Sequence, residues 1–289
     1  MKLENEQLLV EIASLGAEVT RIYDKIQGNE ILWEGNPIFW KRHSPILFPN
    51  VGKTFQNTVR IGERQYPTSQ HGFARDTEFT CVEADACRAE YVMKSDEETR
   101  KIYPYDFTLS IIYHLDGKEL AVEWKVENTS SKAMYFTIGG HPAFRFAKPD
   151  EKKEDYILKF PGKRALTYVL LDLETGTTLE DQTCELELKQ ESCGLNEEMF
   201  ARDALVLDKG QIEEVWICHR DGSPYVGMQC KDFPNFGIWS VKGAPFVCLE
   251  PWVGRCDSYG FTGDISEKPG INCIRPGDIF TKSYKIVVG

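Results

Sequence analysis

The sequence predicts an all-β protein, built as one large and mostly antiparallel β-sandwich. Short segments with hydrophobic residues at every second position recur along the chain. Many of them are separated by turn sequences such as Leu115-Asp116-Gly117-Lys118 and Arg220-Asp221-Gly222-Ser223. Helical periodicity is nearly absent, which argues against a parallel sheet with connecting helices.

Residues 119–128 show the strand pattern most clearly. Their Leu, Val and Trp side chains fall on one face and their Glu and Lys side chains on the other, as in a strand that packs on one side only. The other predicted strands, in chain order, are residues 6–14, 16–23, 77–84, 87–95, 107–115, 133–138, 203–207, 213–218, 224–230, 235–241, 246–249 and 279–288. The charged stretch 148–156 predicts an exposed loop rather than a domain boundary. With no repeat and no low-complexity linker, we expect one domain over residues 1–289.

Composition narrows the classes of partner. The 289 residues are 42% hydrophobic and carry a formal net charge of -11, so nucleic acid and anionic membranes would repel the protein on average. The amino terminus lacks the basic and apolar regions of a signal peptide, and no stretch approaches the ~18 apolar residues of a membrane span. The nine cysteines are scattered without a C-x-x-C pair, which predicts reduced thiols in a cytoplasmic protein and no zinc site.

Two of the five histidines stand in unusual backbone surroundings. His141 lies in "TIGGHPAF", after two glycines and before Pro142, and His71 lies in "QHGFARD". Gly allows a close approach of the backbone and Pro ends the strand pairing, so each side chain is expected at a strand end, facing a cleft. The alternative for each is a buried histidine bonded to a backbone carbonyl.

Glu250 is the third candidate for chemistry. It follows the apolar run 246–249 and precedes Pro251 and Trp252. A carboxylate at the end of a buried strand is costly unless it is paired or faces a solvent-filled cleft, and partial burial would raise its pKa toward that of a general base. Asp203, in "FARDALVL", has a similar position, although a turn residue is the simpler interpretation.

Aromatic residues accompany these polar groups. Phe73, Phe144, Trp239 and Trp252 lie near them in the sequence, as in a pocket that stacks a sugar ring and bonds its hydroxyls. Aromatic residues are also the common core residues of sandwiches. The motifs of nucleotide-binding loops, zinc proteases and serine hydrolases are missing.

Taken together, the motifs resemble those of the aldose 1-epimerase (galactose mutarotase) family, and in particular a subgroup of smaller bacterial mutarotase-like proteins. The resemblance runs through "RHSPILFPNVG" (42–52), "HGFAR" (71–75), "GGHPAF" (139–144), "ALVL" (204–207) and "LEPW" (249–252). It implies a large antiparallel supersandwich that interconverts the α and β anomers of a free aldohexose without a cofactor or a metal.

The resemblance also implies roles for individual residues. Glu250 would be the general base that takes the proton of the C1 hydroxyl, and His141 the general acid that protonates the ring oxygen. His71 would hold that oxygen, and Asp203 would bind sugar hydroxyls. The remaining residues expected to contact the sugar are Arg42, Arg75, Trp252 and Phe144.

The sequence departs from the better-known galactose mutarotases in two places. Gly140 stands where they carry an Asn, and the upstream arginine is matched only by Arg42 or Lys53. The "HGFAR" form is shared with hexose-6-phosphate 1-epimerases, in which case Arg75 and Lys53 would hold a phosphate. A sugar-phosphate epimerase and a non-catalytic sugar-binding protein therefore remain open alternatives. The oligomeric state does not follow from the sequence.

Overall fold

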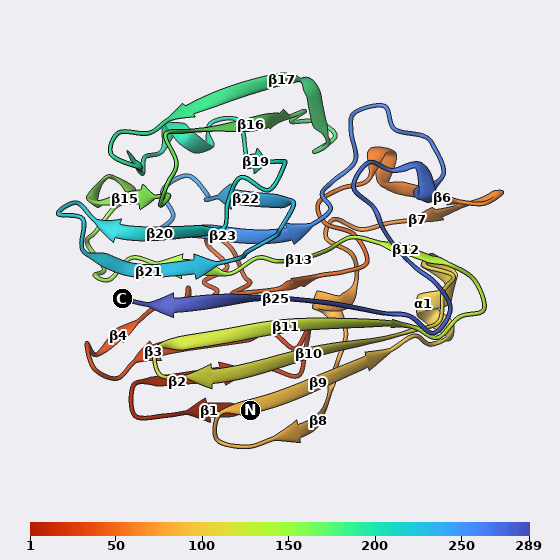
Figure 1. The fold of residues 1–289 in the computed structure, drawn as a ribbon, viewed down its shortest axis with the longest axis horizontal. Helices are drawn as coiled ribbons and strands as arrows, with labels where there is room; N and C mark the ends of the chain where they lie inside the picture. Colours follow the sequence, from red (N-terminus) through yellow and green to blue (C-terminus); the bar gives the residue numbers. More distant parts are fainter.

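The computed structural model describes residues 1–289 and consists almost entirely of antiparallel strands (Figure 1), as predicted. The larger sheet has nine strands. In spatial order these are β18 (Ser192–Gly194), β15 (Tyr156–Lys159), β20 (Glu214–His219), β21 (Pro224–Gln229), β25 (Ile279–Val288), β11 (Glu119–Asn128), β10 (Phe107–Asp116), β9 (Arg88–Lys94) and β8 (Thr80–Ala84).

The second sheet has eight strands and carries the residues of interest. Its spatial order is β17 (Thr178–Glu187), β16 (Ala165–Leu171), β19 (Leu205–Leu207), β22 (Asn235–Trp239), β23 (Phe246–Val253), β13 (Ile138–Gly140) and β5 (Ile46–Leu47), with β14 (Ala143–Arg145) also paired to β23.

Three small sheets complete the strands. The first contains β1 (Lys2–Glu4), β2 (Leu8–Ile12), β3 (Val19–Asp24) and β4 (Asn29–Glu30), in that spatial order. The second pairs β12 (Met134–Phe136) with β24 (Asn272–Ile274), and the third is the hairpin of β6 (Thr58–Ile61) and β7 (Arg64–Pro67). The one α-helix, α1 (Glu97–Ile102), lies near this hairpin at one end of the molecule (right in Figure 1). The 3₁₀ turns are η1 (Phe55–Asn57), η2 (Ala74–Asp76), η3 (Lys153–Asp155), η4 (Glu198–Phe200) and η5 (Ile265–Glu267). No helix has the length and apolar character needed to cross a membrane.

Every predicted strand is present, with ends that shift by a few residues. The main omissions are β15 to β18, between residues 156 and 194. Strand β16 has buried residues on both faces, Leu166 on one and Val169 and Leu171 on the other, so its sequence does not alternate between apolar and polar residues. The neighbouring β17 is an edge strand with mostly exposed residues, so its pattern is polar on both sides.

Alternation along β23 separates the main core from the opposite face of the sheet. Val247, Leu249 and Val253 belong to one cluster of 56 buried apolar residues, which includes residues from Leu3 to Val288. Cys248 packs in a separate small cluster, and Glu250 follows it on the same face. The eight-stranded sheet therefore buries one face in the core and presents Glu250 on the other.

The loop predicted at 148–156 is present, but Lys153 within it is fully buried. Its Nζ donates hydrogen bonds to Oε1 of Glu197 at 2.9 Å and to the carbonyl oxygens of Val241 and Ala244 at 3.0 Å each. A buried ammonium is tolerated because all three of its protons have acceptors. Lys153 thereby ties this loop to the turn between β22 and β23.

Replacing Lys153 by Ala should lower the free energy of unfolding by about 2–4 kcal/mol, because three acceptors lose their buried donor. The melting temperature should fall by several degrees. Lys152→Ala, at an exposed neighbouring position, is the matched control and should melt like the parent protein. Equal melting temperatures for the two variants would contradict this structural role for Lys153.

Candidate active site

A cleft of about 1390 Å³ lies on the face of the eight-stranded sheet that points away from the main core. The structure brings together at this cleft seven of the eight residues predicted from the sequence. They are Arg42, His71, Arg75, His141, Asp203, Glu250 and Trp252. Residues separated by more than 200 positions in the chain thus share one surface.

Glu250 and His141 form a contact at the bottom of the cleft. Nε2 of His141 lies 3.2 Å from Oε2 of Glu250, and the two residues are 6% and 1% exposed. Burial raises the pKa of the Glu250 carboxyl well above its ordinary value, and the charge of Asp203 adds to that increase. Burial lowers the pKa of His141 to about 3. Burial therefore favours a neutral pair, in which one mobile proton lies between the two groups.

His141 is placed by an interruption of the sheet. It lies between β13 and β14, where its N–H donates to the carbonyl of Pro45 at 3.1 Å and the carbonyl of Pro142 accepts from Leu249 at 3.2 Å. Its ring stacks on Trp40 with centroids 4.8 Å apart and meets the edge of Trp239 at 5.6 Å. The imidazole is thus held at a strand end, facing the cleft.

His71 approaches from the other side of the cleft. Its backbone has a positive φ of 66°, and its N–H donates to the carbonyl of Gly52 at 2.8 Å. The N–H of Gly52 donates in return to Nδ1 of His71 at 3.0 Å. Burial, followed by the neighbouring His141, lowers the pKa of His71 well below its ordinary value. The neutral ring must therefore carry its proton on Nε2, as a hydrogen-bond donor.

The indole of Trp252 needs two glycines beside it. A Cβ atom at Gly139, on the adjacent strand β13, would lie 2.5 Å from Cδ1 of Trp252, and one at Gly237, on β22, would lie 2.4 Å from its Cζ2. Real Cβ atoms are never that close to a ring, so any larger residue would displace the indole. Glycine at both positions lets Trp252 cover the sheet beside Glu250.

The two arginines of the cleft are held by neighbouring groups. Nη2 of Arg42 contacts both oxygens of Asp76, at 2.9 and 3.1 Å, and Nη2 of Arg75 donates to the carbonyl of Gln70 at 2.6 Å. Burial, together with Arg42, lowers the pKa of Arg75 to about 10. Asp203 is exposed at the rim and has a positive φ of 70°.

Phe144 does not lie at the cleft, contrary to the expectation from sequence. It is fully buried in the main core. Phe144 pairs with Val247 of β23, which also points into the core, whereas the preceding Ala143 pairs with Cys248 on the opposite face. The one-residue alternation of a strand therefore directs Phe144 away from the site.

Several lining residues were not predicted, and Trp40 and Lys41 matter most among them. Trp40 stacks on His141 from a loop. Its position two residues before Arg42 was the one signal in the sequence that could have identified it. Lys53, which the sequence offered as a residue that would hold a phosphate, also lines the cleft, whereas nothing in the sequence predicts that Lys41 does.

Three buried nitrogen atoms of the cleft residues have no hydrogen-bond partner in the protein. They are Nδ1 of His141, Nε of Arg75 and Nε1 of Trp252. Buried polar atoms normally have partners, so unpaired ones that line a cleft are suited to the hydroxyl groups of a bound molecule. The arrangement can therefore bind a polar ligand and exchange a proton with it.

One group of side chains has spacing suitable for a metal ion. Donor atoms of His141, Cys248 and Glu250 lie within 4.8 Å of one another. Burial raises the pKa of the Cys248 thiol well above its ordinary value, and the charge of Glu250 adds to this. A thiol that stays protonated is a poor metal ligand, because metals bind the thiolate.

Replacing Glu250 by Gln should stabilise the protein at high pH. Between the ordinary pKa of 4.5 and the raised pKa of the folded state, the folded protein holds a proton that the unfolded chain releases, so the stability of the parent falls as the pH rises. The Gln variant has no ionisable group at this position, so its stability does not fall with pH for this reason. Its melting temperature should exceed the parent's by several degrees at pH 8, and the difference should shrink toward pH 4.5. Glu174→Gln, at an exposed position, should show no such pH-dependent difference, and a constant difference for Glu250→Gln would contradict the raised pKa.

Comparison with known proteins agrees with this geometry. Residues 1–254 match the model of the aldose 1-epimerase family. The plasmid-encoded protein LacX of Lactococcus lactis subsp. lactis is 35% identical, over 100% of this chain and 99% of its own. The crystal structure of a galactose mutarotase related enzyme from Lactobacillus acidophilus is 29% identical, with a TM-score of 0.95 over 100% of this chain and 97% of that one. A galactose mutarotase-like protein from Lactobacillus casei is 28% identical, with a TM-score of 0.91 over 100% and 99%. The chain therefore belongs to the aldose 1-epimerase family of isomerases.

Proposed function

We propose that the protein is a cofactor-independent mutarotase, which interconverts the α and β anomers of a free aldohexose in the cytoplasm. The main support is the contact between Glu250 and His141 at the bottom of the cleft, at 3.2 Å. Opening a hemiacetal removes a proton from the C1 hydroxyl and delivers one to the ring oxygen. Both oxygens are bonded to the same carbon, so the base and the acid must be close neighbours.

In this mechanism the carboxylate of Glu250 accepts the proton of the C1 hydroxyl, and the imidazolium of His141 protonates the ring oxygen. The C1–O5 bond breaks, C1 becomes an aldehyde, rotation about C1–C2 exposes its other face, and the reverse transfers close the ring. The free pair already carries the one proton that this needs. Moving that proton from Oε2 of Glu250 to Nε2 of His141 creates the base and the acid without any net uptake.

The other cleft residues position the sugar. His71, with its proton on Nε2, donates to the ring oxygen or to a neighbouring hydroxyl. Asp203 accepts hydrogen bonds from hydroxyls at the rim, and its charge helps to keep the pKa of Glu250 raised. The ring of Trp252 faces the C–H side of the sugar.

We propose that the whole chain is one domain, because the main core includes residues from Leu3 to Val288.

A second candidate substrate is a hexose 6-phosphate. Four cationic side chains line the cleft, namely those of Lys41, Arg42, Lys53 and Arg75. Lys41 and Lys53 form no ion pair within the protein. Such a cluster is unusual in a chain with a net charge of -11, and it would attract a phosphate.

Polarimetry separates the candidates. Freshly dissolved α-D-glucose, α-D-galactose and glucose 6-phosphate are each followed with and without protein, against the spontaneous rate. Acceleration with a free hexose supports the proposal, and acceleration only with the phosphate transfers support to the second candidate. Binding of a sugar without acceleration of any would indicate a non-catalytic sugar-binding protein.

Replacing Glu250 by Gln should reduce kcat by about 100-fold or more while sugar affinity stays close to that of the parent, because the amide keeps the shape but cannot accept a proton.

His141→Asn should reduce kcat by about 10²–10⁴-fold. His71→Asn should raise KM more than it lowers kcat, because its role is to hold the sugar. His114→Asn, on the exposed side of β10, is the control. A His141 variant that melts earlier but keeps its turnover per folded molecule would leave that residue with a structural role only.

The pH profile of kcat/KM should have a broad plateau. The active pair holds one mobile proton, gains a second only below the lowered pKa of His141, and loses its proton only above the raised pKa of Glu250. If Glu250 and His141 had their ordinary pKa values of 4.5 and 6.5, the pH range in which the pair holds one mobile proton would be narrow. The shift of each pKa widens that pH range. Polarimetric rates from pH 4 to 9, corrected for the spontaneous reaction, measure this. A narrow maximum between 4.5 and 6.5 would contradict a pair tuned by burial.

A further inference from the structure

Glu18 carries a largely buried carboxylate that the proposed mechanism does not use. It does not line the cleft, and its side chain is 12% exposed. Its Oε1 accepts hydrogen bonds from two successive backbone N–H groups, those of His43 at 2.7 Å and of Ser44 at 2.8 Å. Two successive N–H groups point at one oxygen only where the chain bends, so this carboxylate holds a bend at His43 and Ser44.

The turn that carries Glu18 is itself firmly held. It connects β2 to β3, and positive φ values of 69° at Gly16 and 47° at Ala17 make it tight. The N–H of Gly16 donates to the carbonyl of Thr77 at 2.8 Å, and the hydroxyl of Tyr113 donates to the carbonyl of Ala17 at 2.6 Å. The position of the carboxylate is thus set outside the cleft, at the small sheet of β1 to β4.

The bend lies directly beside the backbone of His141. Where the pairing of β5 with β13 ends, the chain runs alongside the interruption that carries this histidine. The carbonyl of Pro45 accepts from the N–H of His141 at 3.1 Å, and the carbonyl of His43 accepts from the N–H of Ala143 at 2.9 Å. The bend that Glu18 holds therefore fixes the backbone at the imidazole and two residues beyond it.

The same segment brings in the ring that covers His141. Trp40 stands three residues before His43 and stacks on the imidazole with centroids 4.8 Å apart. Release of the bend at His43 would let the carbonyl groups and the indole move. The imidazole would then turn away from its 3.2 Å contact with Oε2 of Glu250. A displacement of ~1 Å at a reacting group can lower a rate by ~100-fold.

Glu18 also has a charge that acts on the cleft. Burial and Arg42 lower the pKa of Arg75, whereas the charges of Asp76 and Glu18 act in the opposite direction. A test of the hydrogen bonds must separate them from this charge. An amide at position 18 does so, because its oxygen accepts both N–H groups and carries no net charge.

We propose that Glu18 is a positioning residue, whose two hydrogen bonds set the backbone of His141 and thereby aim its imidazole at Glu250. The inference rests on the proposed function, because it takes His141 as the group that protonates the ring oxygen. It adds that the geometry of this acid depends on a carboxylate from another sheet, which does not touch the sugar.

The kinetics of three variants test this role. Polarimetry uses whichever of glucose, galactose and glucose 6-phosphate the parent accelerates, at a temperature at which every variant is folded. Glu18→Ala should lower kcat by about tenfold or more and change KM less than about threefold. Glu18→Gln should keep kcat within about threefold of the parent's, because the amide oxygen remains. Lys153→Ala, destabilised by the loss of a buried ion pair outside the cleft, is the matched control and should keep the parent's kcat.

Proton NMR of the ligand-free protein tests the position of His141 without any turnover. The resonance of its Cε1 proton, identified by its loss in His141→Asn, is displaced by the ring current of the stacked Trp40. The displacement should shrink in Glu18→Ala and remain in Glu18→Gln and Lys153→Ala. The resonance of the exposed His114 should stay in place in all three variants.

The inference is overturned if Glu18→Ala keeps the parent's His141 resonance, or keeps kcat where the parent is active. Equal losses of kcat in Glu18→Ala and Glu18→Gln would assign the effect to the charge, and equal losses in Glu18→Ala and Lys153→Ala would assign it to stability; either result also overturns it. A parent that accelerates no sugar would remove the proposed function instead, and the NMR comparison alone would then decide whether Glu18 positions His141.

Discussion

The site depends on a carboxyl group buried inside a β-sheet. Glu250 is 1% exposed, on a strand with buried residues throughout. An isolated buried carboxylate would be strongly destabilising, and the contact with His141 is what makes this position tolerable. That contact requires the interruption between β13 and β14. In a continuous strand, the backbone hydrogen bonds of the sheet would fix the direction of the histidine side chain. The hydrogen bonds of His141 to Pro45 and of Leu249 to Pro142 hold the interruption in place.

The same strand also has to seal the core. Val247 and Leu249 pack into the main hydrophobic cluster, while Cys248, Glu250 and Trp252 occupy the other face. Strand alternation alone achieves this separation, with no loop needed to carry the carboxyl group of Glu250. A rigid strand is a more precise support than a loop for a group that must meet its partner at hydrogen-bond distance.

Much of this arrangement could be predicted from the sequence, and the omissions have physical reasons. Period-two patterns identified the half-buried strands, and the glycine and proline residues around His71 and His141 indicated their special positions. Strand β16 was missed because it has buried apolar residues on both faces, and β17 was missed because most of its residues are exposed at the edge of the sheet. The prediction for Phe144 was wrong because the sequence of the motif does not show which face of the strand its aromatic residue occupies. Lys153 was missed because its burial depends on acceptors 44 to 91 positions away.

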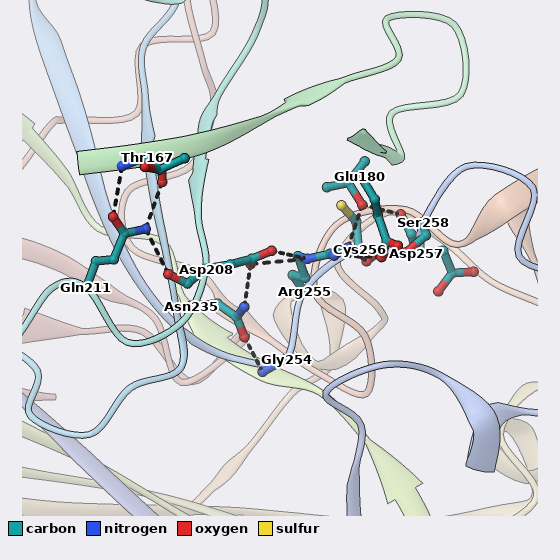
Figure 2. A network of polar contacts seen from close by, with 11 residues as sticks. Thr167, Glu180, Asp208, Gln211, Asn235, Gly254, Arg255, Cys256, Asp257 and Ser258 are labelled. Atoms are coloured by element: carbon teal, nitrogen blue, oxygen red, sulfur yellow. Dashed lines mark hydrogen bonds and ion pairs between the residues drawn. The ribbon is translucent and has the colours of Figure 1, made fainter. Parts of the chain in front are cut away.

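The order of strands places two different chemistries on opposite sides of Glu250. Beyond β5, the backbone bridge between Phe48 and Gly72 brings in the His71 segment, followed by η2 with Arg75. In the other direction, the sheet continues through β22, β19 and β16, where Arg255 is ion-paired with Asp208 and Glu180 (Figure 2). Cationic side chains that line the cleft therefore lie on one side of Glu250, whereas on the other side the charges of both signs neutralise one another.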